Sequence, residues 1–116
     1  MIKRIVFRNM DKSDVMESYA NGQLAKIEEF LSHEKTPIYL DLIFEPSKTH
    51  EHHKVELLVK SPNYHKVISY EHQGTPFYDV IDRVIDTMYF ELHEAKKRLV
   101  EERKMVGRHE EFKKQR

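Results

Sequence analysis

Cysteine and tryptophan are absent from this chain of 116 residues, which also holds only three glycines and four prolines. The lack of cysteine excludes a disulfide framework, a thiolate metal site and a cysteine nucleophile. No apolar run approaches the ~20 residues needed to cross a bilayer, and the first residues lack the apolar core of a signal peptide. We therefore expect a cytoplasmic protein that does not bind a membrane.

The sequence motifs of common enzymes are missing as well, since there is no glycine-rich dinucleotide loop, P-loop or HExxH. Acidic pairs such as Asp82/Asp86 and Glu91/Glu94 have helical spacing and no accompanying nucleophile, which favours a solvated helix face over acid–base catalysis. We predict that the protein is not an enzyme and takes no cofactor or small-molecule substrate.

Three histidines, His50, His52 and His53, cluster beside Glu51. Histidine is a common metal ligand, but a designed site also needs fixed geometry and supporting hydrogen bonds. A solvated polar loop is the favoured interpretation, and no metal site is predicted.

Hydrophobic periodicity predicts six secondary-structure elements. Apolar residues recur at intervals of three and four over residues 14–31 and again from residue 76 to about residue 105, which indicates two amphipathic helices. Alternation of apolar and polar residues predicts strands at 38–45, 54–60 and 66–72, and residues 5–7 indicate a short first strand. Ser61-Pro62-Asn63 predicts a hairpin turn before the last strand.

The resulting order, β-α-β-β-β-α, is that of an α+β fold in a single two-layer domain. Consecutive strands separated by turns predict antiparallel hairpins, and the strand-helix-strand start predicts a parallel neighbour for the first strand. We expect a four-stranded sheet with two helices packed on one face and an exposed, polar opposite face. The domain is expected to span residues 1–106, and residues 107–116 to form a flexible basic tail.

Particular residues predict where the helices begin and end. Ser13 is the expected N-cap of the first helix, Thr75 and Pro76 suit the start of the second, and Gly107 is its expected end. Gly22 weakens the first helix by roughly 1 kcal/mol relative to alanine. We expect Gly22 to mark close packing on the sheet.

Charge is balanced in total but not along the chain. The formal net charge is zero, yet residues 3–8 carry a net charge of +3, and Lys96 to Arg116 contain nine Lys/Arg against four Glu. A basic end can meet phosphate, or it can be a solvated helix end whose cations complement the helix dipole. Charge alone favours the solvated helix end.

Two segments of the chain carry a resemblance to a known family. The first is the segment Leu24-Ala25-Lys26-Ile27-Glu28-Glu29-Phe30. The second consists of Gly74, Phe77, Tyr78, Ile81, Asp82 and Asp86. In their order and spacing, over about residues 2–100, these motifs resemble the short ribosome hibernation-promoting factors and ribosome-associated inhibitor A, the sigma-54 modulation family.

The resemblance implies a stress-response regulator of translation that causes ribosome hibernation without catalysis. Family members dock on the small ribosomal subunit near the decoding centre, where they block the mRNA and tRNA channel through contacts with rRNA. Basic residues on a rigid helical face gain affinity for phosphates by counterion release. The expected RNA-binding residues are Lys26, Arg83, Lys96, Lys97 and Arg98, with Arg103 and Lys104 as weaker candidates.

Departures from the family pattern leave alternatives open. Non-basic residues stand at helical positions that are often basic in the family: Glu17, Gln23, Thr87, Phe90 and Glu94. Three explanations are open. Either the rRNA contact has moved to the basic C-terminal end, or the affinity for rRNA is low, or this is a divergent family member with another partner. In the last case the fold is a protein-interaction module, with Tyr89 and Phe90 on the last helix as anchors. Tyr78, Tyr89 and Phe90 are also candidates for stacking on bases, but we expect Tyr78 to pack at the sheet edge instead.

Overall fold

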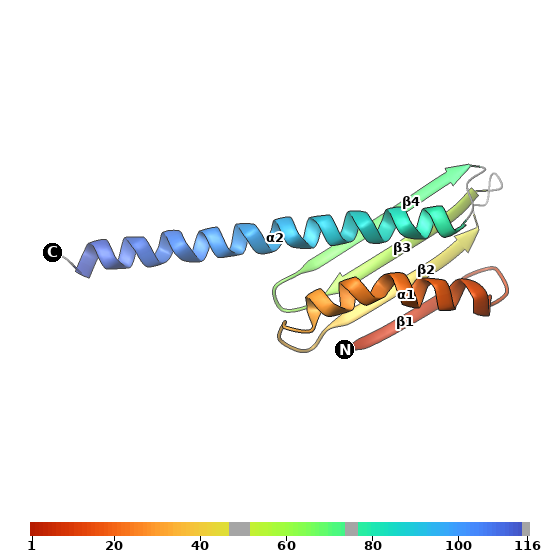
Figure 1. Cartoon of the computed structure of the whole chain (residues 1–116), viewed down its shortest axis with the longest axis horizontal. Helices are drawn as coiled ribbons and strands as arrows, with labels where there is room; N and C mark the ends of the chain where they lie inside the picture. Colours follow the sequence, from red (N-terminus) through yellow and green to blue (C-terminus); the bar gives the residue numbers. More distant parts are fainter. Residues whose placement is uncertain (47–51, 74–76, 115–116) are drawn as a thin grey trace.

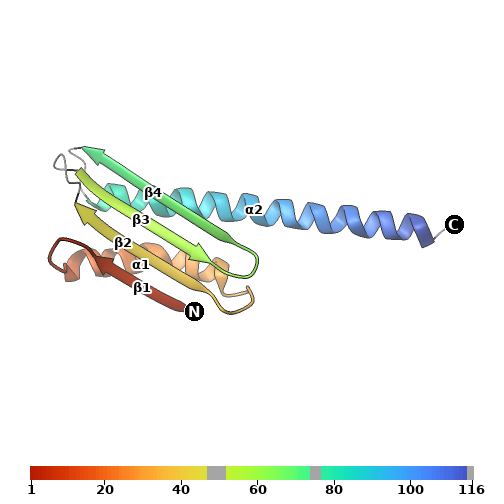
Figure 2. The same cartoon turned by 180° about the vertical axis from the view of Figure 1, so that it is seen from behind.

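The computed structural model describes the backbone of residues 1–46, 52–73 and 77–114, and the side chains of residues 1–46, 54–71 and 77–104. The elements are β1 (Ile2–Phe7), α1 (Asp14–Leu31), β2 (Tyr39–Pro46), β3 (His52–Lys60), β4 (His65–Gln73) and α2 (Phe77–Lys114). This is the predicted β-α-β-β-β-α order. The four strands form one sheet in the order β1-β2-β3-β4, and both helices lie on one face of it (Figures 1 and 2).

Strand pairing follows the predicted topology. β1 runs parallel to β2, while β2, β3 and β4 are antiparallel neighbours. Ile5, Leu42, Leu57 and Ile68 stand opposite one another across the four strands. Because side chains alternate between the faces of a strand, this register directs the alternating apolar residues of all four strands toward the helices.

The core lies between the sheet and the two helices. Its fully buried side chains come from both layers and match most of the predicted stripes: Ala20, Leu24, Ile27 and Leu31 from α1, Leu40, Leu42, Phe44, Val55, Leu57 and Val59 from the sheet, and Val80, Ile81, Val84, Ile85, Met88 and Leu92 from α2. Phe77, Ala95 and Leu99 are partly buried against this cluster. The last core contact of α2 among the described side chains is therefore at Leu99.

β1 begins three residues earlier than the predicted strand at 5–7. The backbone N–H of Ile2 donates to the carbonyl oxygen of Ile38 at 2.8 Å, so pairing with β2 starts there. Lys3 and Arg4 obscured this extension in the sequence because they interrupt the apolar pattern. Each has a carboxylate partner: Lys3 pairs with Glu28 of α1 at 2.6 Å, and Arg4 pairs with Asp41 of β2 at 3.1 Å.

The uncovered face of the sheet is less polar than expected. Ile2, Tyr39 and Val67 are exposed on it, and Asp41 is a buried carboxylate that accepts two hydrogen bonds from Arg4. The expectation of a simply polar face is therefore wrong. Apolar residues also occupy strand positions that point away from the helices.

α1 has the predicted bounds, but its glycine does not have the predicted role. The Ser13 hydroxyl accepts a hydrogen bond from the Met16 N–H at 3.3 Å, which is the expected N-cap. A Cβ placed on Gly22 would have no heavy atom within 4 Å, and Gly22 is exposed. Gly22 therefore does not mark close packing on the sheet, because it points away from it.

α2 is longer than predicted. It continues through Gly107 to Lys114, so the expected helix end at Gly107 is wrong. A single interior glycine costs only about 1 kcal/mol, and the good helix formers around it carry the helix onward. The mobility expected for residues 107–116 stays a prediction. Thr75 and Pro76, the expected start of the helix, lie outside the described residues.

Candidate nucleic-acid interface

The two halves of α2 differ in charge and in surroundings. From Asp79 to Glu94 the helix carries five carboxylates and the single cation Arg83, whereas from Lys96 to Lys104 it carries five cations and two carboxylates. Figure 1 shows that the acidic half lies over the sheet and that the helix then extends well past the sheet and α1. Only Asp79 lies in the first turn, where it complements the helix dipole, and the cations lie where the helix leaves the core.

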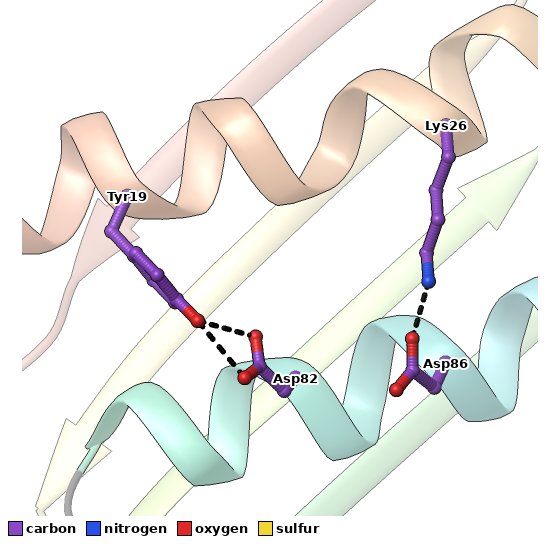
Figure 3. Close-up of polar contacts among 4 residues, drawn as sticks. All are labelled: Tyr19, Lys26, Asp82 and Asp86. Carbon is purple, nitrogen blue, oxygen red and sulfur yellow. Dashed lines mark hydrogen bonds and ion pairs between the residues drawn. The ribbon is translucent and has the colours of Figure 1, made fainter.

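Two polar contacts join the helices along their common side (Figure 3). The Tyr19 hydroxyl donates to the Asp82 carboxylate, with distances of 2.8 and 2.9 Å to its two oxygens, and the Lys26 ammonium pairs with the Asp86 carboxylate. The hydrogen bond to Asp82, with burial and nearby carboxylates adding to it, raises the pKa of Tyr19 above its ordinary value. Asp86 is exposed, as predicted for a solvated face, whereas Asp82 is half-buried, and both carboxylates also have partners on α1.

A groove follows these contacts toward the C-terminal end of α1. It has a volume of about 250 Å³ and is lined by three aromatic or histidine rings, two lysines, a further histidine and one carboxylate: Phe30, Tyr89, His93, Lys26, Lys96, His33 and Glu29. We call these seven residues the interhelix groove. Both helices contribute to it, so its shape depends on their packing against the sheet.

The rings and ammonium groups of the interhelix groove contact one another. The His93 ring lies 4.3 Å from the Tyr89 ring and 4.8 Å from the Phe30 ring, centroid to centroid, in edge-to-face geometry. The Lys26 ammonium lies 5.1 Å from the Tyr89 centroid, and the Lys96 ammonium lies 5.5 Å from the Phe30 centroid. These distances are within the range of cation–π attraction.

The opposite flank of α2 faces β4 and has a different composition. The Arg83 guanidinium lies 5.0 Å from the centroid of the Tyr70 ring. Further along, Phe90 and Arg98 line a second hollow of about 360 Å³ together with Lys66, Glu91, Glu94 and Ala95. This hollow carries two carboxylates beside its two cations, so it is less suited to phosphate than the interhelix groove.

The predicted RNA-binding residues are therefore not gathered into one patch. Lys26 and Lys96 meet in the interhelix groove, whereas Arg83 and Arg98 lie on the flank that faces β4. Lys97 and Lys104 are exposed farther along α2.

Arg103 is exposed and its charge acts on Tyr64, beside the turn between β3 and β4. Burial, aided by Glu34, raises the pKa of Tyr64, and Arg103 opposes this increase. The predicted cations thus surround α2 on several sides.

The predicted aromatic anchors are separated too. Tyr89 is half-buried in the interhelix groove, whereas Phe90 is 64% exposed on the other flank. Tyr78 packs edge-on against Tyr19 of α1 at 4.9 Å, so its expected place at the sheet edge is wrong. A single patch of Tyr78, Tyr89 and Phe90 is not formed.

Sequence reasoning did not single out Phe30, His33 and His93 as parts of a site. Two spacings in the sequence could have indicated the two histidines, because Tyr89 and His93, and likewise Glu29 and His33, stand four residues apart and share a helix face. What the sequence could not provide is that these two faces meet.

The described part of the chain holds neither a cluster of metal ligands nor a membrane-spanning helix. No group of three His, Cys, Asp or Glu side chains is placed there to hold a metal ion, and no helix is long and apolar enough to cross a bilayer. Of the histidine cluster, His50 lies outside the described residues, as do the side chains of His52 and His53.

The comparisons with solved structures show the same fold at low sequence identity. The N-terminal domain of Protein Y from Thermus thermophilus superposes with a TM-score of 0.59 at 18% identity, over 77% of this chain and 90% of that domain. A ribosomal subunit interface protein from Coxiella burnetii superposes with a TM-score of 0.65 at 17% identity, over 84% of this chain and 99% of that protein.

No curated protein matches the chain by sequence. A family profile does, and it spans the sheet, α1 and α2 as far as the last core contacts. The chain belongs to the sigma 54 modulation protein / S30EA ribosomal protein family, whose profile matches residues 4–100.

Proposed function

We propose that this protein is a cytoplasmic ribosome-binding inhibitor of translation that docks on the rRNA of the small subunit and occludes the mRNA and tRNA channel. The observation that carries the proposal is the family match over residues 4–100. The structurally similar protein from Coxiella burnetii is a ribosomal subunit interface protein, which supports the same partner. The action requires no catalysis, since a rigid body that occupies the channel excludes its normal ligands.

The geometry of α2 supports docking through charge. Residues 96–104 carry a net charge of +3 and are mostly exposed on a helix that projects from the core (Figure 2). A projecting helix can approach phosphates from several sides without displacing the sheet. Each phosphate neutralised by such a cation releases counterions, which provides affinity without reading a base sequence.

The acidic half of α2 does not prevent this mode of docking. Asp82 and Asp86, which would repel phosphate, are hydrogen-bonded or ion-paired with Tyr19 and Lys26. Lys26 thus compensates the charge of Asp86, whereas the neutral Tyr19 hydroxyl stabilises the Asp82 carboxylate without changing its charge. The net positive potential lies farther along the helix, so we place the main phosphate contacts there.

Co-sedimentation with purified small subunits at low and moderate salt tests the proposal. We expect saturable binding that weakens steeply with salt. Replacing the exposed Lys97 with alanine should lower the salt slope by about one unit. Lys60→Ala, at an exposed position of β3, is the matched control and should leave the slope unchanged. If simultaneous charge reversal of Lys96, Lys97 and Arg98 leaves the affinity intact, the docking surface is wrongly assigned.

Occlusion is tested separately from binding. A small subunit saturated with the protein should fail to bind a short labelled mRNA, and excess mRNA should compete with the protein. Simultaneous binding of both without mutual weakening would contradict channel occlusion while leaving ribosome binding in place.

Phe90 supports a second candidate, a protein-interaction module on the same fold. Its ring is 64% exposed beside a hollow on the β4 flank, as an anchor residue would be. The affinity of such a protein interface should depend only weakly on salt concentration, whereas the affinity for RNA should fall steeply as salt rises. Loss of a protein partner by Phe90→Ala, without any small-subunit binding by the wild-type protein, would favour this candidate.

A further inference from the structure

The interhelix groove combines features that the charge-based docking above does not use. It places aromatic rings and Lys96, which forms no ion pair among the described residues, in one hollow between α1 and α2. We propose that this groove binds a single unpaired nucleotide of RNA, with the base on the Tyr89 and Phe30 rings and the phosphate on Lys96. The inference rests on the proposed function in taking RNA as the partner, and it adds a defined subsite to it.

A flexible lysine lies over each ring beside the ring's contact with His93, and an incoming base can displace that lysine. The ammonium groups of Lys26 and Lys96 are 5.1 Å and 5.5 Å from the Tyr89 and Phe30 centroids. An exposed cation–π contact is weaker than the stacking of a base on an aromatic ring. An incoming base therefore displaces both ammonium groups from the rings. Lys96 then turns toward the phosphate of the same nucleotide, and Lys26 keeps its ion pair with Asp86.

The charges around the groove match one phosphate group better than many. Among the described residues, Lys96 makes no ion pair with a carboxylate, whereas Lys26 is paired with Asp86. His33 and His93 add ring nitrogens that can bond to phosphate or base, and Glu29 is the single carboxylate of the lining. Lys96 is accordingly the principal phosphate ligand in this arrangement.

The size of the groove limits what it can hold. Its volume of about 250 Å³ is below the roughly 300 Å³ at which pockets for drug-sized ligands begin. One base is of this scale, and its sugar and phosphate would lie at the open side of the groove. A base must leave its stack to enter, so the site selects single-stranded or bulged RNA over duplex, whose bases are not exposed on their faces.

Binding of defined oligonucleotides to the full chain tests the proposal. The probes are a fluorescent ten-nucleotide oligoadenylate and a ten-base-pair RNA duplex, each titrated at one fixed salt concentration. Loss of one stacked base corresponds to roughly a 5- to 150-fold weaker affinity, so Tyr89→Leu should bind oligoadenylate at least fivefold more weakly. Phe90→Leu is the matched control, since it alters the neighbouring ring outside the groove, and it should stay within about twofold of wild type.

Further variants separate stacking from folding. Tyr89→Phe keeps the ring and should bind like the wild type. Lys96→Gln, at an exposed position, should weaken the binding of oligoadenylate without lowering the melting temperature of the protein. The ring proton signals of His33 and His93 in the NMR spectrum should shift when oligoadenylate is added and should not shift with the duplex.

Several results would overturn the proposal: equal losses for Tyr89→Leu and Phe90→Leu, unchanged affinity of Lys96→Gln, or equal affinity for the duplex. Should these occur while small subunits still bind, the subsite is wrong and the proposed function stands. If the wild-type protein does not bind small subunits but binds oligoadenylate through Tyr89, the proposed subsite is supported and the proposed ribosomal function is wrong.

Discussion

Gly22→Ala should make this protein more stable, and the reason lies in how α1 is built. Gly22 occupies the ninth position of an 18-residue helix, far from either cap. Glycine in a helix interior costs roughly 0.5–1 kcal/mol relative to alanine, because the unfolded chain loses more freedom on folding. The added methyl group would meet no heavy atom within 4 Å and would point to solvent. No steric cost therefore offsets the entropic gain.

The expected gain in the free energy of unfolding is about 0.5–1 kcal/mol. For a chain of this length, each kcal/mol raises the melting temperature by about 4 °C, so an increase of about 2–4 °C is expected. Urea titrations followed by circular dichroism should show a higher midpoint with an unchanged slope, because the surface exposed on unfolding hardly changes.

A reciprocal substitution three positions along the same helix provides the control. Ala25 is also exposed, so Ala25→Gly should destabilise the protein by about the amount that Gly22→Ala stabilises it. A stability loss in Gly22→Ala, with the expected loss in Ala25→Gly, would refute the reasoning. It would mean that residue 22 needs glycine for a contact or backbone shape absent from this structure.

Three other predictions follow from the described contacts. The pKa of Tyr19 is higher in the folded protein than in the unfolded chain, where it is about 10. The neutral phenol therefore contributes its full stabilisation below pH ~10, and this contribution is lost as the pH rises through the pKa of the folded protein. Tyr19→Phe should therefore lose less stability between pH 8 and 11 than wild type in urea titrations, and parallel losses would contradict the role of the Asp82 hydrogen bond. Asp86→Asn should free Lys26 and raise small-subunit affinity about two- to fivefold at low salt, with at most ~1 kcal/mol of stability lost; a weaker affinity would show that the pair itself is needed. Leu92→Ala should lower the free energy of unfolding by about 2–5 kcal/mol, since Leu92 is fully buried, and a loss below 1 kcal/mol in a urea titration would contradict that burial.

The sequence allowed accurate prediction wherever local pattern and tertiary packing require the same residues. The bounds of α1 were predicted correctly because Ser13 can cap only the helix that follows it, and because the stripe from Ala20 to Leu31 is the face that the sheet covers. Prediction failed where one local signal stood alone. Gly107 suggested an end to α2, but a cost of about 1 kcal/mol does not interrupt a helix whose neighbouring residues favour it.

The site was predictable in its charges but not in its grouping. Lys26 and Lys96 stand 70 positions apart, and only the packing of α1 against α2 brings both to one groove. Compensation of Asp86 by Lys26 is likewise invisible in either helix alone. Tyr89 and Phe90 adjoin in sequence, yet consecutive helical residues are about 100° apart around the axis, so the two rings lie on different flanks.

The length of α2 is not explained by the stability of the fold. Leu99 is its last residue packed against the core among the described side chains, and residues 100–104 are exposed. The 15 residues from Val100 to Lys114 nevertheless extend the helix by about 22 Å, at the end where its cations gather. The exposed residues 100–104 add little buried surface, and isolated helices of about 15 residues are marginal in water. A surface outside the protein that contacts the projecting half would supply the missing stabilisation, and a polyanion fits its charge.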